Sequence, residues 1–255
     1  MVKGEGIKME KKMKKAVDLV LDTVFPPRCP VCGKISNQMG RTCKECVNVF
    51  SIISEPICKK CGKQIKDVTK EYCLDCTKKK FHYIQGFPMW NYDKAMRKSV
   101  SAFKYHNKKE YGRYYAERMA WYLGDKIIAT GCQVLVPVPV HKSRLKKRGY
   151  NQAQVLADNL SNILKIPVVD DLLIRTRKTM PQKELSDAQR LKNLRCAFET
   201  NPRNDIIKKD KIKSIMLVDD IYTTGSTIEA CTLELLKAGI EKVYFTSICI
   251  GKGYD

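Results

Sequence analysis

Four closely spaced cysteine pairs constrain this chain more than any other feature of its sequence. Two residues separate the cysteines of each pair, and the gaps between successive pairs are 10, 11 and 11 residues. The eight residues are Cys29, Cys32, Cys43, Cys46, Cys58, Cys61, Cys73 and Cys76. One C-x-x-C turn presents two thiolates to an ion, and tetrahedral zinc needs two such turns. The pattern therefore predicts two structural zinc ions in closed, non-catalytic sites.

Two arrangements of the four turns satisfy this pattern. Sequential pairing gives two tandem ribbons, whereas a cross-braced arrangement interleaves them; the short, nearly equal gaps favour the tandem ribbons. Gly33 and Gly62 follow the second cysteine of the first and third pairs, where the backbone must turn tightly under the metal. Disulfides are disfavoured in the cytoplasm, and a redox dithiol does not come in four copies.

The residue patterns divide the chain into three regions. Residues 1–25 are interpreted as a basic amphipathic helix, with apolar residues at helical spacing and Pro26-Pro27 at its end. Residues 26–80 form the predicted double zinc ribbon, and residues 85–255 alternate between helical and strand patterns. Helices are expected at 95–104, 111–123, 152–164 and 228–238, and strands at 132–140, 214–218 and 242–250. This alternation predicts an α/β fold with a mostly parallel sheet flanked by helices.

The charge of the chain is strongly positive and unevenly distributed. The formal net charge is +21, and residues 91–150 carry 14 basic against 4 acidic side chains. Residues 1–90 carry 18 against 9, while residues 151–255 are nearly balanced at 16 against 14. Such a field favours a polyanionic partner, with nucleic acid as the leading candidate, over a generic lysine-rich surface.

The most specific chemical signal is the segment 215–228, IMLVDDIYTTGSTI. An apolar strand delivers Asp219 and Asp220, and a loop of small hydroxyl residues and glycine then opens a helix. The N-terminus of a helix presents unpaired N–H groups and a partial positive charge, and small side chains let a phosphate approach that backbone. The alternative interpretation is a capped acidic turn. Because strand, acids, loop and helix all agree, a phosphate site is favoured.

This segment resembles the phosphoribosyl pyrophosphate (PRPP) motif of type I phosphoribosyltransferases. The resemblance implies that Asp219 and Asp220 bind the ribose hydroxyls. It also implies that the 5-phosphate is surrounded by Thr223, Thr224, Gly225, Ser226 and Thr227. A cation-rich loop containing Lys142, Arg144 and Arg148 corresponds to the loop that lies against the pyrophosphate. Arg177 and Arg190 belong to the segment 175–198, which corresponds to the flexible loop that closes over PRPP.

From about Val24 to its end, the chain resembles one branch of the phosphoribosyltransferase-type proteins, the ComF competence family. The resemblance rests on the cysteine pairs and on two segments, VPVPVHKSRLKKRGYNQAQVLA and VDDIYTTGST. The resemblance implies a role in uptake of single-stranded DNA during natural transformation, with a helicase-like partner at the inner face of the membrane. Many relatives carry fewer cysteine pairs, so the second ribbon is interpreted as an elaboration. PRPP would bind with Mg²⁺.

Three functions remain open. The first is a competence protein that binds single-stranded DNA and PRPP. Aromatic residues interleaved with cations, such as Phe103-Lys104-Tyr105 and Arg113-Tyr114-Tyr115, would stack on bases, although core packing explains part of them. The second is an active phosphoribosyltransferase for an unknown nitrogen acceptor, with Asp219 and Asp220 catalytic and Asp220 as acid–base residue by family analogy. The third is a zinc-ribbon adaptor with an unused loop.

The sequence shows no apolar run of the roughly 18 residues that a membrane-spanning helix needs, and no signal peptide at its basic N-terminus. A cytoplasmic location is therefore expected, with peripheral attachment to the inner face of the membrane as a secondary interpretation.

Overall fold

The computed structural model describes residues 26, 28–36, 42–176 and 197–251. The amphipathic helix expected within residues 1–25 lies outside these residues. The chain divides into two compact units, Met1–Val49 and Phe50–Asp255. The first four-cysteine site lies in the first unit. The second lies in the same compact unit as the α/β sheet.

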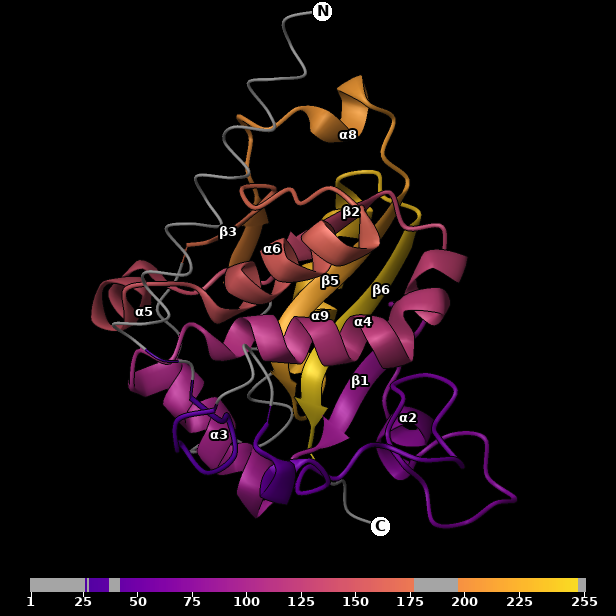
Figure 1. Cartoon of the computed structure of the whole chain (residues 1–255). Helices are drawn as coiled ribbons and strands as arrows, with labels where there is room; N and C mark the ends of the chain where they lie inside the picture. The colour runs from indigo at the N-terminus through magenta and orange to yellow at the C-terminus, as the bar shows by residue number, and fades with distance from the viewer. Residues whose placement is uncertain (1–25, 27, 37–41, 177–196, 252–255) are drawn as a thin grey trace, which may run out of the picture. The chain divides into compact units, whose positions relative to one another are not determined.

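The described helices and strands follow one another in the order shown in Figure 1. They are η1 (Lys44–Cys46), α2 (Leu74–Lys78), β1 (Gly86–Asn91), α3 (Lys94–Tyr105), α4 (Tyr111–Ala129), β2 (Val134–Pro137), α5 (Lys142–Arg148), α6 (Gln152–Leu164), β3 (Leu173–Arg175), β4 (Phe198–Thr200), α8 (Ile206–Lys209), β5 (Ser214–Tyr222), α9 (Ser226–Lys237) and β6 (Lys242–Ile250).

The central sheet has the strand order β1-β6-β5-β2, and every neighbouring pair is parallel. A separate antiparallel pair joins β3 to β4. Helices α4 and α6 lie in front of the sheet in Figure 1, and α9 lies behind it. The predicted fold class is confirmed: a mostly parallel sheet flanked by helices, which a zinc-ribbon module precedes in the sequence.

The pleat of β5 divides the core into two layers. Side chains alternate along a strand, so Ile215 and Leu217 face one side of the sheet and Met216 and Val218 the other. Ile215 and Leu217 belong to the same buried cluster as Leu235 of α9. Because the strands are parallel, their carboxyl ends all meet at one edge, where the loop after β5 and the connections into α3 and α5 lie together.

Two elements differ from the expected ones. Helix α4 runs past the predicted end at residue 123 because Gly124 remains helical: a Cβ there would come within 3.2 Å of Leu164 Cδ2, so α4 passes close to α6. The cation-rich loop after β2 contains a helix, α5. His141 caps it by accepting a hydrogen bond from the N–H of Ser143, and Gly149, with φ of +80°, ends it.

Within the part of the chain that the structure describes, no helix is long and apolar enough to cross a membrane.

Candidate functional site

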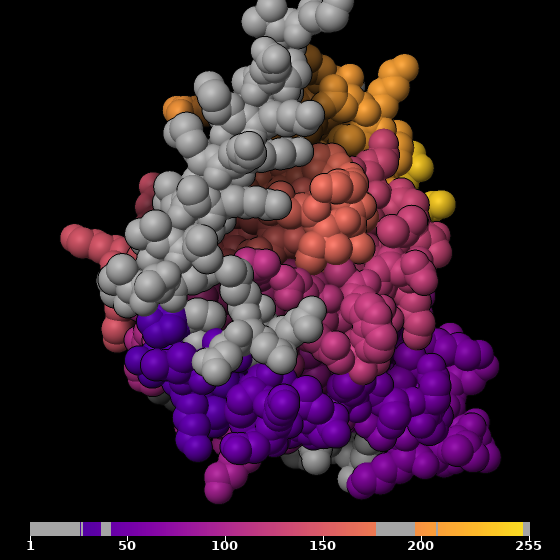
Figure 2. Space-filling view, viewed as in Figure 1, coloured from indigo at the N-terminus to yellow at the C-terminus, as the bar shows by residue number. Residues whose placement is uncertain are grey.

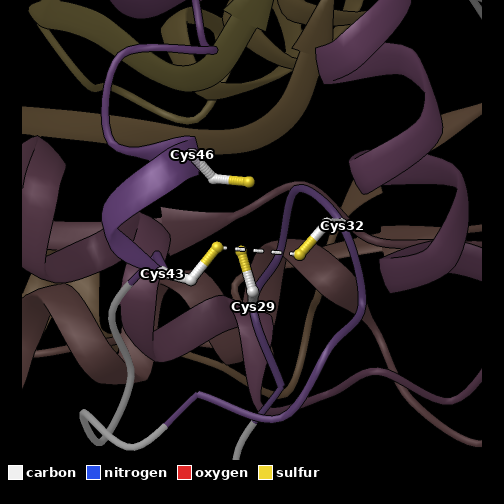
Figure 3. Close-up of side chains that lie close together, drawn as sticks. All are labelled: Cys29, Cys32, Cys43 and Cys46. Carbon is white, nitrogen blue, oxygen red and sulfur yellow. Dashed lines mark hydrogen bonds between the residues drawn. The ribbon is translucent and has the colours of Figure 1, made fainter.

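The first four-cysteine cluster brings together Cys29, Cys32, Cys43 and Cys46, whose sulfurs converge in Figure 3. The ligand atoms lie within 4.8 Å of one another, and the Sγ atoms of Cys32 and Cys43 are 3.8 Å apart. The first turn is closed by two backbone hydrogen bonds. Gly33 N–H donates to the carbonyl of Cys29 at 2.9 Å, and Cys29 N–H donates to the carbonyl of Lys34 at 2.8 Å. Gly33 makes this turn possible with a φ of +76°.

The second cluster, formed by Cys58, Cys61, Cys73 and Cys76, repeats the same turn. Gly62 N–H donates to the carbonyl of Cys58 at 2.9 Å, and Cys58 N–H to that of Lys63 at 2.7 Å. Gly62 also has a positive φ, of +74°. Unlike Gly33, it is closely approached: a Cβ on Gly62 would lie 2.5 Å from Pro88 Cδ of β1. The second ribbon is therefore packed directly on the edge strand of the sheet.

Both clusters fit a tetrahedral zinc ion. Four sulfurs placed about 2.3 Å from zinc lie about 3.8 Å from one another. The 3.8 Å between the sulfurs of Cys32 and Cys43 and the 3.6 Å between those of Cys61 and Cys73 agree with this spacing. Each cluster joins consecutive pairs, so the sequential pairing is confirmed and the cross-braced arrangement is excluded. Each of the two clusters therefore fits one structural zinc ion.

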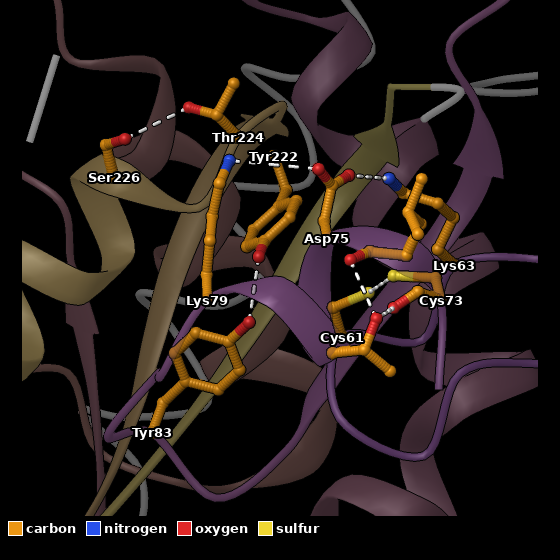
Figure 4. Close-up of polar contacts among 11 residues, drawn as sticks. Cys61, Lys63, Cys73, Asp75, Lys79, Tyr83, Tyr222, Thr224 and Ser226 are labelled. Carbon is orange, nitrogen blue, oxygen red and sulfur yellow. Dashed lines mark hydrogen bonds and ion pairs between the residues drawn. The ribbon is translucent and has the colours of Figure 1, made fainter. Parts of the chain in front are cut away.

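A buried lysine accompanies the second cluster. The side chain of Lys63 is 4 % exposed, and its Nζ lies 2.6 Å from Asp75 Oδ2 (Figure 4). Burial disfavours the charged amine, but the hydrogen bond to Asp75 and the nearby thiolates of Cys73 and Cys61 outweigh it and raise the pKa of Lys63. Four thiolates around one Zn²⁺ carry a net charge of about −2, so a buried cation beside them offsets part of that charge.

The segment that leaves the second ribbon contacts the candidate phosphate loop. The hydroxyls of Tyr83 and Tyr222 are 2.8 Å apart, and both side chains are buried (Figure 4). His82 donates its backbone N–H to Glu229 Oε2 at 2.9 Å, and its ring Nδ1 pairs with the other carboxylate oxygen. Glu229 is 3 % exposed and lies in the first turn of α9. The segment that follows the second ribbon therefore contacts both ends of the loop between β5 and α9.

The loop itself has the shape that the sequence predicts for a phosphate seat. Strand β5 ends at Tyr222 and α9 begins at Ser226, with Thr223, Thr224 and Gly225 between them. Gly225 has a φ of +81°, and a Cβ there would lie 2.4 Å from the Tyr222 hydroxyl and 2.8 Å from Phe81 Cε1. Only glycine fits this position. The hydroxyls of Thr224 and Ser226 lie 3.1 Å apart at the start of α9.

The two acids that precede the loop point to opposite faces of the sheet. Asp220 continues the row of Met216 and Val218 and forms an ion pair with Lys104 of α3, with 2.9 Å between Nζ and Oδ1. Asp219 continues the opposite row, where its charge influences Arg175 of β3. Burial and the neighbouring Asp220 carboxylate raise the pKa of Asp219 to about 7. The pair therefore combines one carboxylate that is bound to a lysine with one whose pKa lies near neutrality.

Cations surround these acids. Burial, followed by the positive charge of Arg144, lowers the pKa of Arg175. The charges of Lys104 and Arg175 in turn favour the ionised form of Asp219 and oppose the rise of its pKa. Helix α5 carries five basic residues and no acid. Lys142 and Arg144 are exposed, whereas Arg148 stacks 4.8 Å from the ring centre of Tyr105 and donates to its hydroxyl at 3.0 Å. Arg177 and Arg190 lie outside the described residues.

Sequence analysis did not identify Lys104 or the His82–Glu229 pair as parts of this site. It placed Arg175 only as the first residue of the segment corresponding to the flexible loop, whereas the structure places it at the end of strand β3. Lys104 was noted only within Phe103-Lys104-Tyr105, as one of the segments where aromatics alternate with cations. In the structure, Phe103 and Tyr115 are fully buried and Tyr114 is 6 % exposed, so these rings belong to the core. Tyr105, at 59 % exposed, is the member of these segments whose ring lies at the surface. The spacing of Phe103 from Tyr105 does not reveal which ring faces outward until α3 is packed.

The fold and the sites define a class of protein: a double zinc ribbon joined to an α/β domain with a candidate phosphate loop. In agreement, residues 20–77 match the family model described as a double zinc ribbon domain. Competence protein F of Haemophilus influenzae is 29 % identical over 227 residues, which cover 86 % of this chain and 95 % of that protein. Competence protein ComFC of Bacillus subtilis is 27 % identical over 205 residues, or 78 % of this chain and 79 % of that protein.

A shorter match joins the chain to the DNA utilization protein YhgH of Escherichia coli K12, which is 33 % identical over 123 residues, 47 % of this chain and 52 % of that protein. The chain is thus a homologue of the ComF competence proteins, as the resemblance predicted.

Proposed function

We propose that this protein handles single-stranded DNA during DNA uptake and binds PRPP, with Mg²⁺, at the loop between β5 and α9. The names of its relatives, which refer to competence and DNA utilization, support the DNA role. One observation carries the PRPP part. The paired acids, the glycine-containing loop and a group of cations meet at the carboxyl edge of a parallel sheet, which is where such sheets bind ligands.

Each part of this edge matches a part of PRPP. The start of α9 would receive the 5-phosphate, and Asp219 and Asp220 would contact the ribose hydroxyls. Arg144 and the other cations of α5 would face the pyrophosphate, which Mg²⁺ would also neutralise. Because Lys104 already holds Asp220, ligand hydroxyls would share that carboxylate with the lysine.

The DNA part rests on charge. Helix α5 presents Lys146 and Lys147 among its exposed cations, and the Arg148–Tyr105 stack lies beside them. Cations that neutralise phosphates release counterions, so their affinity for DNA falls steeply as salt rises.

The DNA proposal is tested by measuring the affinity for a single-stranded oligonucleotide across a salt series. Each of Lys146→Ala and Lys147→Ala should reduce the slope of log affinity against log salt by about 0.7, the value for one contact to a single strand. Lys237→Ala is the matched control, because that lysine is exposed at the far end of α9 and pairs with Glu234. Absence of binding at low salt, or a flat salt response, would refute the proposal.

The PRPP proposal is tested by calorimetry with PRPP and Mg²⁺. Combined Asp219→Asn and Asp220→Asn substitutions should abolish the heat of binding while circular dichroism stays unchanged. Asp210→Asn, at an exposed turn after α8, serves as the control. If the wild-type protein gives no heat, the loop does not bind PRPP.

A phosphoribosyltransferase activity is a second candidate, favoured by the pKa of Asp219 near 7. A carboxylate with such a pKa exchanges protons efficiently at neutral pH, so Asp219 becomes a better acid–base candidate than the lysine-bound Asp220. Release of pyrophosphate from PRPP, measured with candidate nitrogen acceptors, tests this activity. The adaptor hypothesis and the helicase-like partner at the membrane stay predictions.

A further inference from the structure

The outer face of α4 carries an exposed cluster of aromatic rings around one arginine. Trp121 is 70 % exposed and Tyr122 is 39 % exposed. Their ring centroids are 4.4 Å apart in an edge-to-face arrangement. The guanidinium carbon of Arg118 lies 4.9 Å from the ring centre of Trp121 and 5.0 Å from that of Tyr122, and Arg118 also donates to the Tyr122 hydroxyl at 3.2 Å. The three side chains therefore form one ordered unit at the surface.

This cluster makes little contribution to the core. The earlier aromatic residues of the same helix, Tyr114 and Tyr115, are buried and pack against Trp90. Trp121 lies on the solvent side of α4, where most of its apolar surface gains nothing from folding. Although Arg118 and Tyr122 contact the Trp121 ring, 70 % of this residue stays exposed, so ring surface is available to a planar partner.

A cavity of about 780 Å³ borders the cluster. Its lining includes Tyr122 and Lys126 of α4, Glu55 just before the second ribbon and Lys59 within that ribbon. Pro88 of the edge strand β1 also lines it. The purple surface around residues 50–75 and the magenta surface of α4 adjoin on the face seen in Figure 2. The cavity therefore continues the aromatic cluster into an apolar recess that is large enough for a nucleobase.

We propose that Trp121, Arg118 and Tyr122 form a stacking platform for the unpaired bases of single-stranded DNA, with the adjoining cavity as the seat for a neighbouring base. This inference rests on the proposed DNA binding and assigns it a site that is separate from the phosphate loop. Gly86, at the amino end of β1, lines the cavity, whereas the phosphate loop lies at the carboxyl edge of the sheet. Bases stack on tryptophan regardless of sequence, and Arg118 and Lys126 accompany the stack with positive charge.

The local charges indicate how electrostatic attraction and base stacking divide the work of binding at this site. Lys59 is paired with Glu71, so the cavity adds little net charge of its own. The strong positive charge of residues 91–150 attracts the strand, and stacking then holds it at Trp121. A duplex, whose bases already stack on one another, lacks the free base faces that this platform needs.

The test uses the tryptophan fluorescence of the full chain. The sequence has two tryptophans; Trp90 is 2 % exposed, so added ligand reaches Trp121 alone. An oligothymidylate of about 16 nucleotides should quench the emission, whereas inorganic polyphosphate and a duplex of equal length should not. In a separate anisotropy assay, Trp121→Ala should weaken binding of the oligothymidylate roughly 5- to 150-fold and leave the salt slope unchanged. Trp121→Phe should lose less, and Ile128→Ala, at an exposed position of the same helix, should change nothing.

The outcomes separate the inference from the proposed function. If the wild-type chain binds oligothymidylate but Trp121→Ala binds equally well, the platform is wrong and the DNA proposal stands. Quenching by polyphosphate as strong as that by oligothymidylate would also overturn it, because phosphate contacts would then explain the signal. If the wild-type chain does not bind oligothymidylate at low salt, both proposals fail together.

Discussion

The hydroxyl pair between Tyr83 and Tyr222 offers the sharpest test of how the second ribbon is joined to the sheet. The two residues are 139 positions apart in the chain, and their hydroxyls are 2.8 Å apart. Tyr83 is fully buried and Tyr222 is 4 % exposed, so water cannot replace a lost partner. We expect Tyr83→Phe and Tyr222→Phe each to destabilise the protein.

The size of the effect follows from burial. A buried hydroxyl left without a partner costs about 1–3 kcal/mol, whereas removal of both partners costs much less than twice that. Each single substitution should therefore reduce the folding equilibrium constant roughly 5- to 150-fold. For a unit of this size, the melting temperature should fall by roughly 2–4 °C for each kcal/mol. The free energy of unfolding of the double variant should be no lower than that of the less stable single variant, within about 0.5 kcal/mol.

Urea unfolding of the zinc-loaded protein measures all four members of this double-mutant cycle. Tyr72→Phe is the matched control, because Tyr72 is 43 % exposed on the same ribbon and its loss of a hydroxyl should change stability by less than about 0.5 kcal/mol. Two results would refute the reasoning. One is that both single substitutions behave like the control. The other is that their costs add fully in the double variant, which would mean that the hydroxyls do not interact.

Two further predictions concern the metal sites and Asp219. Cys61→Ser and Cys32→Ser should each lose about one zinc ion by metal analysis. Only Cys61→Ser should destabilise the α/β unit, by roughly 6–12 °C for a loss of about 3 kcal/mol, because Cys61 is 1 % exposed in its core cluster. Equal melting temperatures would contradict this difference. In the folded protein the pKa of Asp219 is raised to about 7, so its carboxyl keeps its proton up to that pH. In the unfolded chain the same carboxyl loses its proton at about pH 4. Stability should therefore fall between pH 4 and pH 7, at up to about 1.4 kcal/mol per pH unit, and this slope should disappear in Asp219→Asn; an unchanged slope would assign the proton to another group.

The metal sites could be predicted from the sequence because their information is local. Each C-x-x-C pair determines one turn, aided in the first and third pairs by the glycine that follows, and the nearly equal gaps favoured the observed pairing of Cys29/Cys32 with Cys43/Cys46. The strand–loop–helix around Gly225 was predictable for the same reason, since its strand pattern, small residues and helix lie within one short segment.

Other features depend on contacts that no local pattern records. Strand β1 contains Gly86 and Pro88, which are poor strand formers, yet it pairs with β6 along its length. Residue 86 must be glycine because the Phe245 ring of β6 occupies the space that a side chain there would need. The ion pair of Lys104 with Asp220 joins α3 to β5 across 116 positions of sequence, and only the packed fold brings them together. Sequence analysis therefore located the loop without the groups that surround it.

The Tyr83–Tyr222 contact also bears on how this chain can be divided. A fragment that begins at residue 85 would keep every strand of the central sheet, yet it would lose Tyr83 and His82. Tyr83 contacts Tyr222 and Phe245, and His82 contacts Glu229. The shortest self-sufficient piece should instead begin at Phe50 and retain its zinc ion. In this chain the metal-binding motif and the α/β fold are therefore not interchangeable modules, because one of the two ribbons is part of the folding unit beside it.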